Sequence, residues 1–223
     1  MESGSPPAPK AVAERDSRRR KRDRVRSEVL GAALELAEQG SFRDLTVDEI
    51  ARSAGISRSA FYLHFRDKHD LLLAALEVAA NELYGMADRW WNGEGPPAEL
   101  VRQAIEGVVG VYAEQAELLR IATEVSTYDA EVREVWIGIA ERFIVATSDH
   151  IRSEQAAGLM PRVLDPRATA EALVWMNERC CYIYLARGER TPQQVIDPIT
   201  RVWTGALYPG VIPADEFTGS DPA

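Results

Sequence analysis

The stretch TVDEIARSAGISRSAFYLHF, from Thr46 to Phe65, contains two helix starts in close succession. Thr46 followed by Glu49 three residues later is a capping box, in which the two side chains close the first turn of a helix. Gly55 then breaks this helix, and Ser57 is a favourable cap for a second helix that ends near Phe65. Two short helices joined by about three residues that include glycine are typical of a helix-turn-helix.

The second short helix has the polar start that a DNA-reading helix needs. Such a helix exposes its first turn to base edges in the major groove, while its other face packs on a small core. Ser57, Arg58 and Ser59 occupy this turn, and an arginine is long enough to bond both O6 and N7 of guanine. Phe61 and Phe65 would form the buried face. We expect base or phosphate contacts from Thr46, Ser57, Arg58, Ser59, Ala60, Tyr62, His64 and Lys68.

Beyond this region the apolar residues keep a helical period. A long helix is expected from Asp67 to Trp91, where the run NGEGPP stops it. Further helices are expected over the ranges 97–115, 116–126, 129–155, 166–187 and 192–208. No segment alternates with a period of two, so the sequence predicts an all-α fold of about nine helices.

The order of these segments predicts four parts. Residues 1–22 are rich in proline, serine and charge, and we expect a disordered basic arm there. Residues 23–69 would form a three-helix head, and the long helix would join it to a helical C-terminal domain over residues 70–210. Residues 211–223 would be a flexible tail.

Charge is distributed unevenly along the chain. The formal net charge is -9, but residues 1–70 sum to +2, because they hold 14 Lys and Arg against 12 Asp and Glu. The remaining residues hold 12 basic and 23 acidic side chains, which is -11. The basic run from Arg18 to Arg26 is either a solvated tail or a segment that binds a polyanion such as DNA.

Several other classes of protein are disfavoured by the sequence. No stretch approaches 18 consecutive apolar residues and no apolar segment follows the basic run, so we expect no membrane span, no signal peptide and a cytoplasmic location. The adjacent Cys180 and Cys181 suit neither a disulfide framework nor a zinc site. No catalytic triad, phosphate-binding loop or metal cluster stands out, so we expect no enzyme, no cofactor and no metal.

The segment LTVDEIARSAGISRSAFYLHFRDKHDLL, from Leu45 to Leu72, resembles the DNA-binding domain of the TetR family of transcriptional regulators. The likeness covers the glycine before the recognition helix, the Tyr-x-His-Phe end of that helix and the lysine that follows it. It implies a homodimer whose two heads enter successive major grooves of a palindromic double-stranded DNA operator. It also implies a C-terminal domain that dimerises and binds a small molecule.

A second likeness lies in LVWMNERCCYIYLARGE, from Leu173 to Glu189, which is similar to one group within that family. Members of this group hold apolar ligands in a long tunnel, so the likeness implies a small apolar effector. At several tunnel positions this chain has smaller residues than the group is expected to have. The cavity would therefore be either wider or differently packed. For any single aromatic, core packing is the alternative interpretation. The implied ligand-binding residues are Leu100, Val101, Ala104, Val108, Tyr112, Trp136, Ala140, Phe143, Thr147, Asn177, Glu178, Tyr182 and Trp203.

Asn177 and Glu178 lie on a helix that is apolar nearly all round and should therefore be central. A buried amide or carboxylate needs a partner, because an unsatisfied polar group inside a protein is costly. Asn177 is best interpreted as a polar anchor for the ligand. Glu178 could instead pair with Arg179, with Arg142 or with a backbone group.

The residues favour a dimeric, ligand-responsive repressor, with two alternatives. An all-α enzyme in which Glu178 and Tyr182 perform acid–base chemistry would turn over an apolar compound and have no operator. A module that keeps the head as a scaffold would bind DNA weakly and without sequence preference. The last two helices would form the dimer as a four-helix interface.

Overall fold

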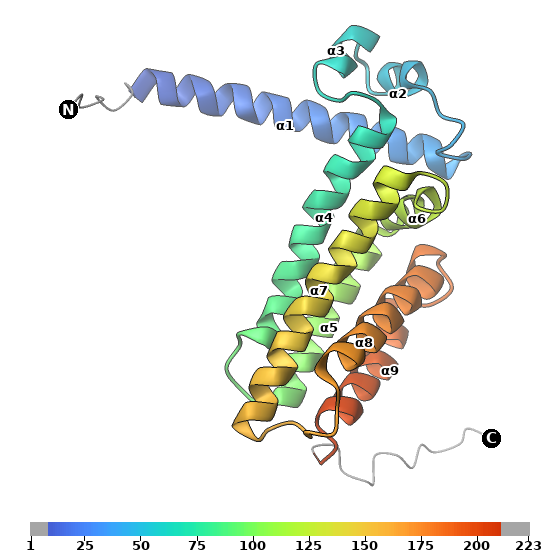
Figure 1. Cartoon of the computed structure of the whole chain (residues 1–223). Coiled ribbons are helices and arrows are strands. Elements are labelled where there is room, and N and C mark those ends of the chain that lie inside the picture. Colours follow the sequence, from blue (N-terminus) through green and yellow to red (C-terminus); the bar gives the residue numbers. More distant parts are fainter. Residues whose placement is uncertain (1–8, 211–223) are drawn as a thin grey trace. The chain divides into compact units, whose positions relative to one another are not determined.

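The computed structural model describes residues 9–210, so the tail predicted over 211–223 and the first eight residues of the predicted arm lie outside it. Within that range the chain forms nine α-helices and one π-helical segment, without a strand (Figure 1). The predicted all-α fold is confirmed. In chain order the elements are α1 (Pro9–Glu38), α2 (Val47–Ser53), α3 (Arg58–Tyr62), α4 (Lys68–Trp91), α5 (Pro97–Glu114), α6 (Ala116–Val125), α7 (Ala130–Ala157), α8 (Pro166–Cys181), η1 (Tyr182–Ala186) and α9 (Pro192–Leu207).

Contacts within the chain divide it into two compact units, with the boundary between Ala75 and Leu76 inside α4. The first unit contains α1, α2, α3 and the start of α4, and the second contains the rest of α4 and the helices that follow. The boundary expected from the sequence, between residues 69 and 70, falls in the same helix.

A small apolar core holds the first unit together. Phe61 and Phe65 are both buried, and their ring centroids are 5.5 Å apart. Large aromatic side chains bury the most apolar area per residue, so these two rings fix α3 on α1 and α2. The predicted anchoring role of the two phenylalanines is confirmed. The core consists of Val29, Ala33, Ile50, Ala51, Phe61, Phe65 and Leu71.

Local hydrogen bonds fix the starts of α2 and α3. The backbone N–H of Thr46 donates to Glu49 Oε2 at 2.8 Å, and the N–H of Glu49 donates to Thr46 Oγ1 at 3.3 Å. Ser57 Oγ accepts the N–H of Ala60 at 3.1 Å. Gly55 has φ +67°, a left-handed conformation that side chains with a Cβ rarely adopt. The predicted capping box, glycine turn and serine cap are therefore confirmed.

Lys68 ties the start of α4 to the loop between α1 and α2. Its ammonium group donates to the carbonyl oxygens of Phe42, Arg43 and Leu45 at 2.9, 2.6 and 2.7 Å. An ammonium group has three donors, so all of them are used within the chain. Burial lowers the pKa of Lys68, although the negative charge of Asp44 opposes this shift.

The N-terminal segment differs from the sequence expectation. Residues 9–22, predicted to belong to a disordered arm, form the first part of α1. Proline is favoured at the first position of a helix, and the alanines, lysines, arginines and glutamates that follow Pro9 are strong helix formers. The prediction relied on the lack of large apolar residues, whereas helix propensity decides the local conformation here. Ion pairs one turn apart add to it: Arg19–Asp23 at 3.9 Å and Arg24–Glu28 at 3.5 Å.

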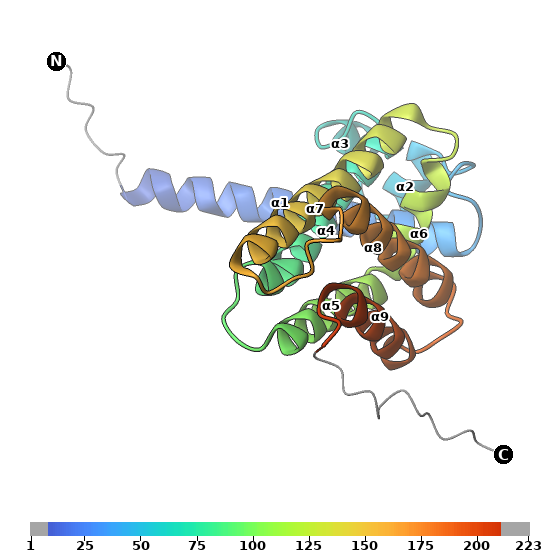
Figure 2. The same ribbon diagram turned by 60° about the horizontal axis from the view of Figure 1, so that its bottom comes forward.

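Two pairs of helices pack along each other in the second unit, α7 with α8 and α5 with α9 (Figure 2). The helix predicted over 166–187 is α8 followed directly by η1, which packs against α6 and α5. The two cysteines are free thiols, with Cys181 buried and Cys180 half-buried. The largest enclosed side chains of this unit are Leu76, Val101, Val109, Ile121, Val125, Ile151 and Leu207.

None of the helices between residues 9 and 210 combines the length and the apolar content that a membrane span requires.

Replacing Lys68 by methionine removes the three hydrogen bonds to the loop while keeping most of the side-chain volume. We expect the free energy of unfolding to fall by about 2 kcal/mol, because bonds from a charged donor are replaced by unsatisfied carbonyls. Chemical denaturation followed by circular dichroism measures the change. The exposed Lys21→Met is the matched control. Equal stability of the two variants would show that Lys68 does not hold the loop.

Candidate functional site

The first unit presents an exposed polar face around the start of α3. Ser57, Arg58 and Ser59 are exposed on its first turn, and the hydroxyl oxygens of the two serines are 3.0 Å apart. Thr46, which caps α2, and Tyr62, at the end of α3, are also exposed. An exposed polar first turn on a helix whose opposite face is buried is the arrangement that fits a major groove.

Arg58 is held between two neighbours on this face. Its Nη1 donates to Asp48 Oδ2 at 2.5 Å, and its Nη2 donates to the hydroxyl of Tyr62 at 3.4 Å. The bond to Tyr62 and the charge of Asp48 raise the pKa of Arg58. An exposed ion pair contributes little stability, so Asp48 mainly orients the arginine. Sequence reasoning assigned Asp48 no role, because this contact depends on how the turn brings α2 and α3 together.

Four residues expected to bind DNA are partly buried or engaged in contacts within the protein. Lys68 donates to three loop carbonyls, and its phosphate contact stays a prediction that would require at least one of these bonds to be exchanged. The Nδ1 atom of His64 is enclosed, which leaves only Nε2 for a phosphate. Arg26, expected to act with the basic arm, lies 4.4 Å from the ring centroid of Phe65 and donates to the His64 carbonyl at 2.9 Å. Ala60 is half-buried within α3.

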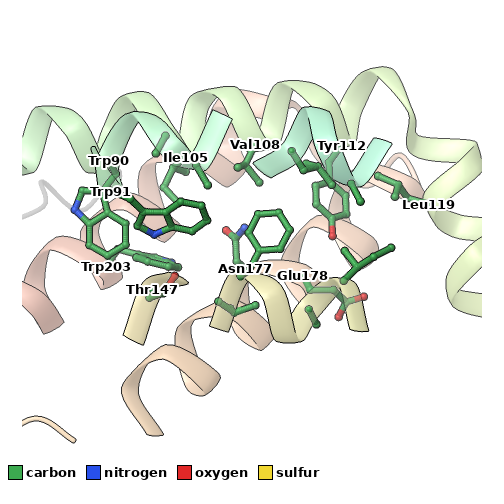
Figure 3. Close-up of a pocket in the computed structure, with 18 of the residues that line it drawn as sticks. Trp90, Trp91, Ile105, Val108, Tyr112, Leu119, Thr147, Asn177, Glu178 and Trp203 are labelled. Carbon is green, nitrogen blue, oxygen red and sulfur yellow. The ribbon is translucent and has the colours of Figure 1, made fainter. Parts of the chain in front are cut away.

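The second unit contains an apolar cavity bounded mainly by α4, α5, α7, α8 and α9 (Figure 3). The cavity and the solvent space at its opening together have an empty volume of about 870 Å³. The predicted ligand-binding residues that line it are Val101, Ala104, Val108, Tyr112, Trp136, Ala140, Phe143, Thr147, Asn177, Glu178 and Trp203.

Two of the predicted ligand-binding residues, Leu100 and Tyr182, are not among the lining residues. Leu100 precedes the inward-facing Val101 by one position, which turns its side chain about 100° away around the helix axis. It packs beside Gly93 in the turn between α4 and α5. Tyr182 starts η1, with the guanidinium of Arg179 5.2 Å from its ring centroid. For both residues, ligand binding stays a prediction that the cavity lining does not support.

Sequence reasoning missed the contribution of α4 to the cavity wall. The signal was present, because the lining residues of α4 recur at helical spacings of three and four before Trp91. The same pattern is also typical of ordinary core packing, and only the tertiary structure distinguishes the two. The missed lining residues are Leu76, Ala80, Leu83, Ala87, Trp90, Trp91, Ile105, Leu119, Ile139 and Val174.

Aromatic side chains form one end of the cavity. The indole N–H of Trp90 donates to the hydroxyl of Tyr208 at 3.2 Å, and its ring meets that of Trp203 edge-on, with centroids 5.5 Å apart. His150 packs on the other side of Trp90, with ring centroids 4.3 Å apart. The indole nitrogens of Trp91 and Trp203 are buried and have no hydrogen-bond partner. This end is therefore apolar, with two unused donors.

Polar groups gather at the centre and the opposite end of the cavity. Asn177 projects into the middle, and the hydroxyl of Tyr112 points toward Glu178 (Figure 3). Asn177 Oδ1 and Glu178 Oε1 are both buried without a partner. Burial raises the pKa of Glu178, an effect that the positive charge of Arg179 partly opposes. Burial also raises the pKa of Tyr112, with smaller contributions from Cys181 and Glu178.

Comparison with known proteins matches separate parts of the chain to two family descriptions. Residues 29–75 match "Bacterial regulatory proteins, tetR family", and residues 101–209 match "Transcriptional regulator EthR, C-terminal domain". The first match contains the exposed face around α3, and the second contains most of the cavity wall.

Similar proteins extend the match over most of the chain. The HTH-type transcriptional regulator EthR of Mycolicibacterium smegmatis is 30% identical over 192 residues, which is 83% of this chain and 86% of that protein. EthR of Mycobacterium tuberculosis strain H37Rv is 28% identical over 187 residues, 81% and 85% of the two chains. A TetR-family regulator of Syntrophomonas wolfei shares the fold, with a TM-score of 0.71 at 18% identity over 86% of this chain and 98% of its own. The chain therefore belongs to the TetR family of bacterial transcriptional regulators and carries a C-terminal domain of the EthR type.

Proposed function

We propose that this transcriptional regulator is a homodimeric repressor that binds a palindromic operator in the cytoplasm and leaves it when a small apolar molecule enters the cavity. The cavity carries the proposal, because an apolar enclosure with a few unsatisfied polar atoms is the usual form of a small-molecule site. The alternative of an enzyme using Glu178 and Tyr182 is not retained. Its relatives are regulators, and Tyr182 does not line the cavity.

The proposed DNA contacts divide into base-reading and phosphate-binding groups. Arg58 would read a guanine, with Ser57 and Ser59 beside it on the exposed turn of α3. Thr46 and Tyr62 would bind phosphates on either side and so set the register of the head on the duplex. The exposed arginines of α1 would add contacts that do not depend on sequence.

The proposed dimer contact lies on α8 and α9, which pack against each other. Val195, Ile199 and Trp203 are only 2%, 3% and 6% exposed within the protomer, so they belong to its own core. Val202 on α9 and Trp175 on α8 remain 47% and 38% exposed. Large apolar side chains left exposed on adjoining helices would be covered by a second copy of the chain.

The proposed release of DNA is a shift between two populations. Two recognition helices reach successive major grooves when they are about 34–36 Å apart. A ligand that binds more tightly to a conformation with a different spacing shifts the population toward that conformation. The affinity for the operator then falls, by no more than the ratio of the ligand's affinities for the two conformations. Helix α4 is the proposed lever, because it begins at Lys68 in the first unit and lines the cavity with Trp90 and Trp91.

Selection of bound duplexes from a random DNA pool, at near-physiological salt, tests the proposed function. We expect enrichment of a palindrome whose half-sites are centred about one helical turn apart, or a multiple of it, because two symmetric heads must reach grooves on one face of the duplex. Sequencing of the bound pool gives the result. Recovery of DNA without any enriched sequence would contradict the proposed repressor.

Two sets of substitutions separate sequence reading from general attraction to DNA. Replacement of the exposed Arg19, Arg20, Arg22 and Arg24 by glutamine should weaken binding to all duplexes alike and flatten the salt dependence, by about 0.9 in log–log slope per lost phosphate contact. Arg58→Ala should instead relax specificity at one base pair in each half-site. Binding titrations against the operator and single-base variants, at several salt concentrations, measure both effects. A uniform loss for both sets would remove Arg58 from base reading.

A further inference from the structure

We propose that the effector of this regulator is a lipophilic amine, whose ammonium ion pairs with Glu178 at the polar end of the cavity. The inference rests on the proposed function, because it assumes that the cavity receives the effector. It assigns a chemical class to a molecule that the fold alone leaves undefined.

Two unsatisfied acceptors belong to consecutive residues of α8, one in the middle of the cavity and the other at its polar end (Figure 3). Asn177 Oδ1 and Glu178 Oε1 are both buried and have no hydrogen-bond partner, and Glu178 as a whole is only 8% exposed. A buried acceptor without a partner is costly, so a ligand that donates to Glu178 Oε1 gains from the protein's own deficit. An ammonium group carries several N–H donors and no acceptor, which matches a carboxylate oxygen of this kind.

Glu178 is the only charged side chain among the residues that line the cavity. Its second oxygen, Oε2, lies 3.8 Å from Nε of Arg179, whose side chain is 57% exposed. This partner is hydrated and reaches only one oxygen, so most of the carboxylate charge is left for a ligand. An isolated buried carboxylate is unfavourable, and a cation beside Oε1 would compensate it.

The same wall disfavours a ligand with a carboxylate. The lining residues include no lysine, arginine or histidine, so an acidic head group would find no cation. It would also be repelled by Glu178. The net charge of -11 over residues 71–223 acts in the same direction, because an acidic body attracts cations and repels anions.

The remainder of the wall suits the rest of such a molecule. Trp91, Trp136, Phe143 and Trp203 line the cavity together with aliphatic side chains. An apolar tail would occupy the aromatic end, where these rings bury it. Asn177 stands between the tryptophans and Tyr112, so a ligand of moderate length would contact both regions (Figure 3).

Isothermal titration calorimetry with three probes that share one phenylbutyl body tests the inference. The probes are 4-phenylbutylamine, 4-phenylbutan-1-ol and 4-phenylbutyrate, at neutral pH. We expect the amine to bind about tenfold more tightly than the alcohol, because it pairs with a buried carboxylate, and the butyrate to bind least. Equal affinities, or tightest binding of the butyrate, would overturn the amine and leave the cavity as an effector site. If none of the three probes binds, both the amine and the cavity as an effector site are overturned.

Glu178→Gln identifies the group responsible. This variant keeps the shape of the side chain and removes its charge, so the preference for the amine over the alcohol should disappear. Glu171→Gln, at a half-buried position on the same helix whose carboxylate pairs with Arg167 and does not line the cavity, is the matched control and should keep the preference. Persistence of the preference in Glu178→Gln would show that this carboxylate does not hold the amine. The comparison of probes on the unmodified protein stands even if that variant fails to fold.

Discussion

The packing of two helix pairs, α7 with α8 and α5 with α9, is the constraint on which the second unit depends. Side chains from these helices and from α4 meet around a space that they do not fill. Protein interiors are normally packed as densely as organic crystals, so a space of this kind removes stabilising contacts. The small residues Ala80, Ala87, Ala104 and Ala140 in its wall leave part of that space unfilled. Asn177 and Glu178 of α8 also face that space, so α8 buries less apolar surface there.

The head could be predicted from the sequence because its decisive interactions are local. The bonds between Thr46 and Glu49, and between Ser57 and Ala60, join residues three positions apart. Gly55 is recognised by residue type alone, since few other residues adopt its conformation. The bonds from Lys68 to the loop were not predicted, because its partners lie more than twenty residues earlier in the chain. No local pattern reveals such a contact.

The cavity could be predicted only through resemblance, and only in part. Asn177 stood out because an amide within an apolar helix needs an explanation. Leu100 and Tyr182 do not line the cavity, because one position along a helix moves a side chain to another face. Trp90 and Trp91 were missed because an apolar stripe has the same spacing whether it borders a cavity or a filled core. Distinguishing these cases requires the side chains of other helices.

The distribution of tryptophan has a consequence for spectroscopy. Four of the five tryptophans, Trp90, Trp91, Trp136 and Trp203, line the cavity, and only Trp175 lies elsewhere, partly exposed on α8. The ultraviolet emission of the protein therefore comes mainly from indoles that surround one internal space. Replacement of Trp175 by phenylalanine would confine that emission to the cavity. The protein thus carries an internal optical reporter of the polarity and occupancy of its own interior, without any added label.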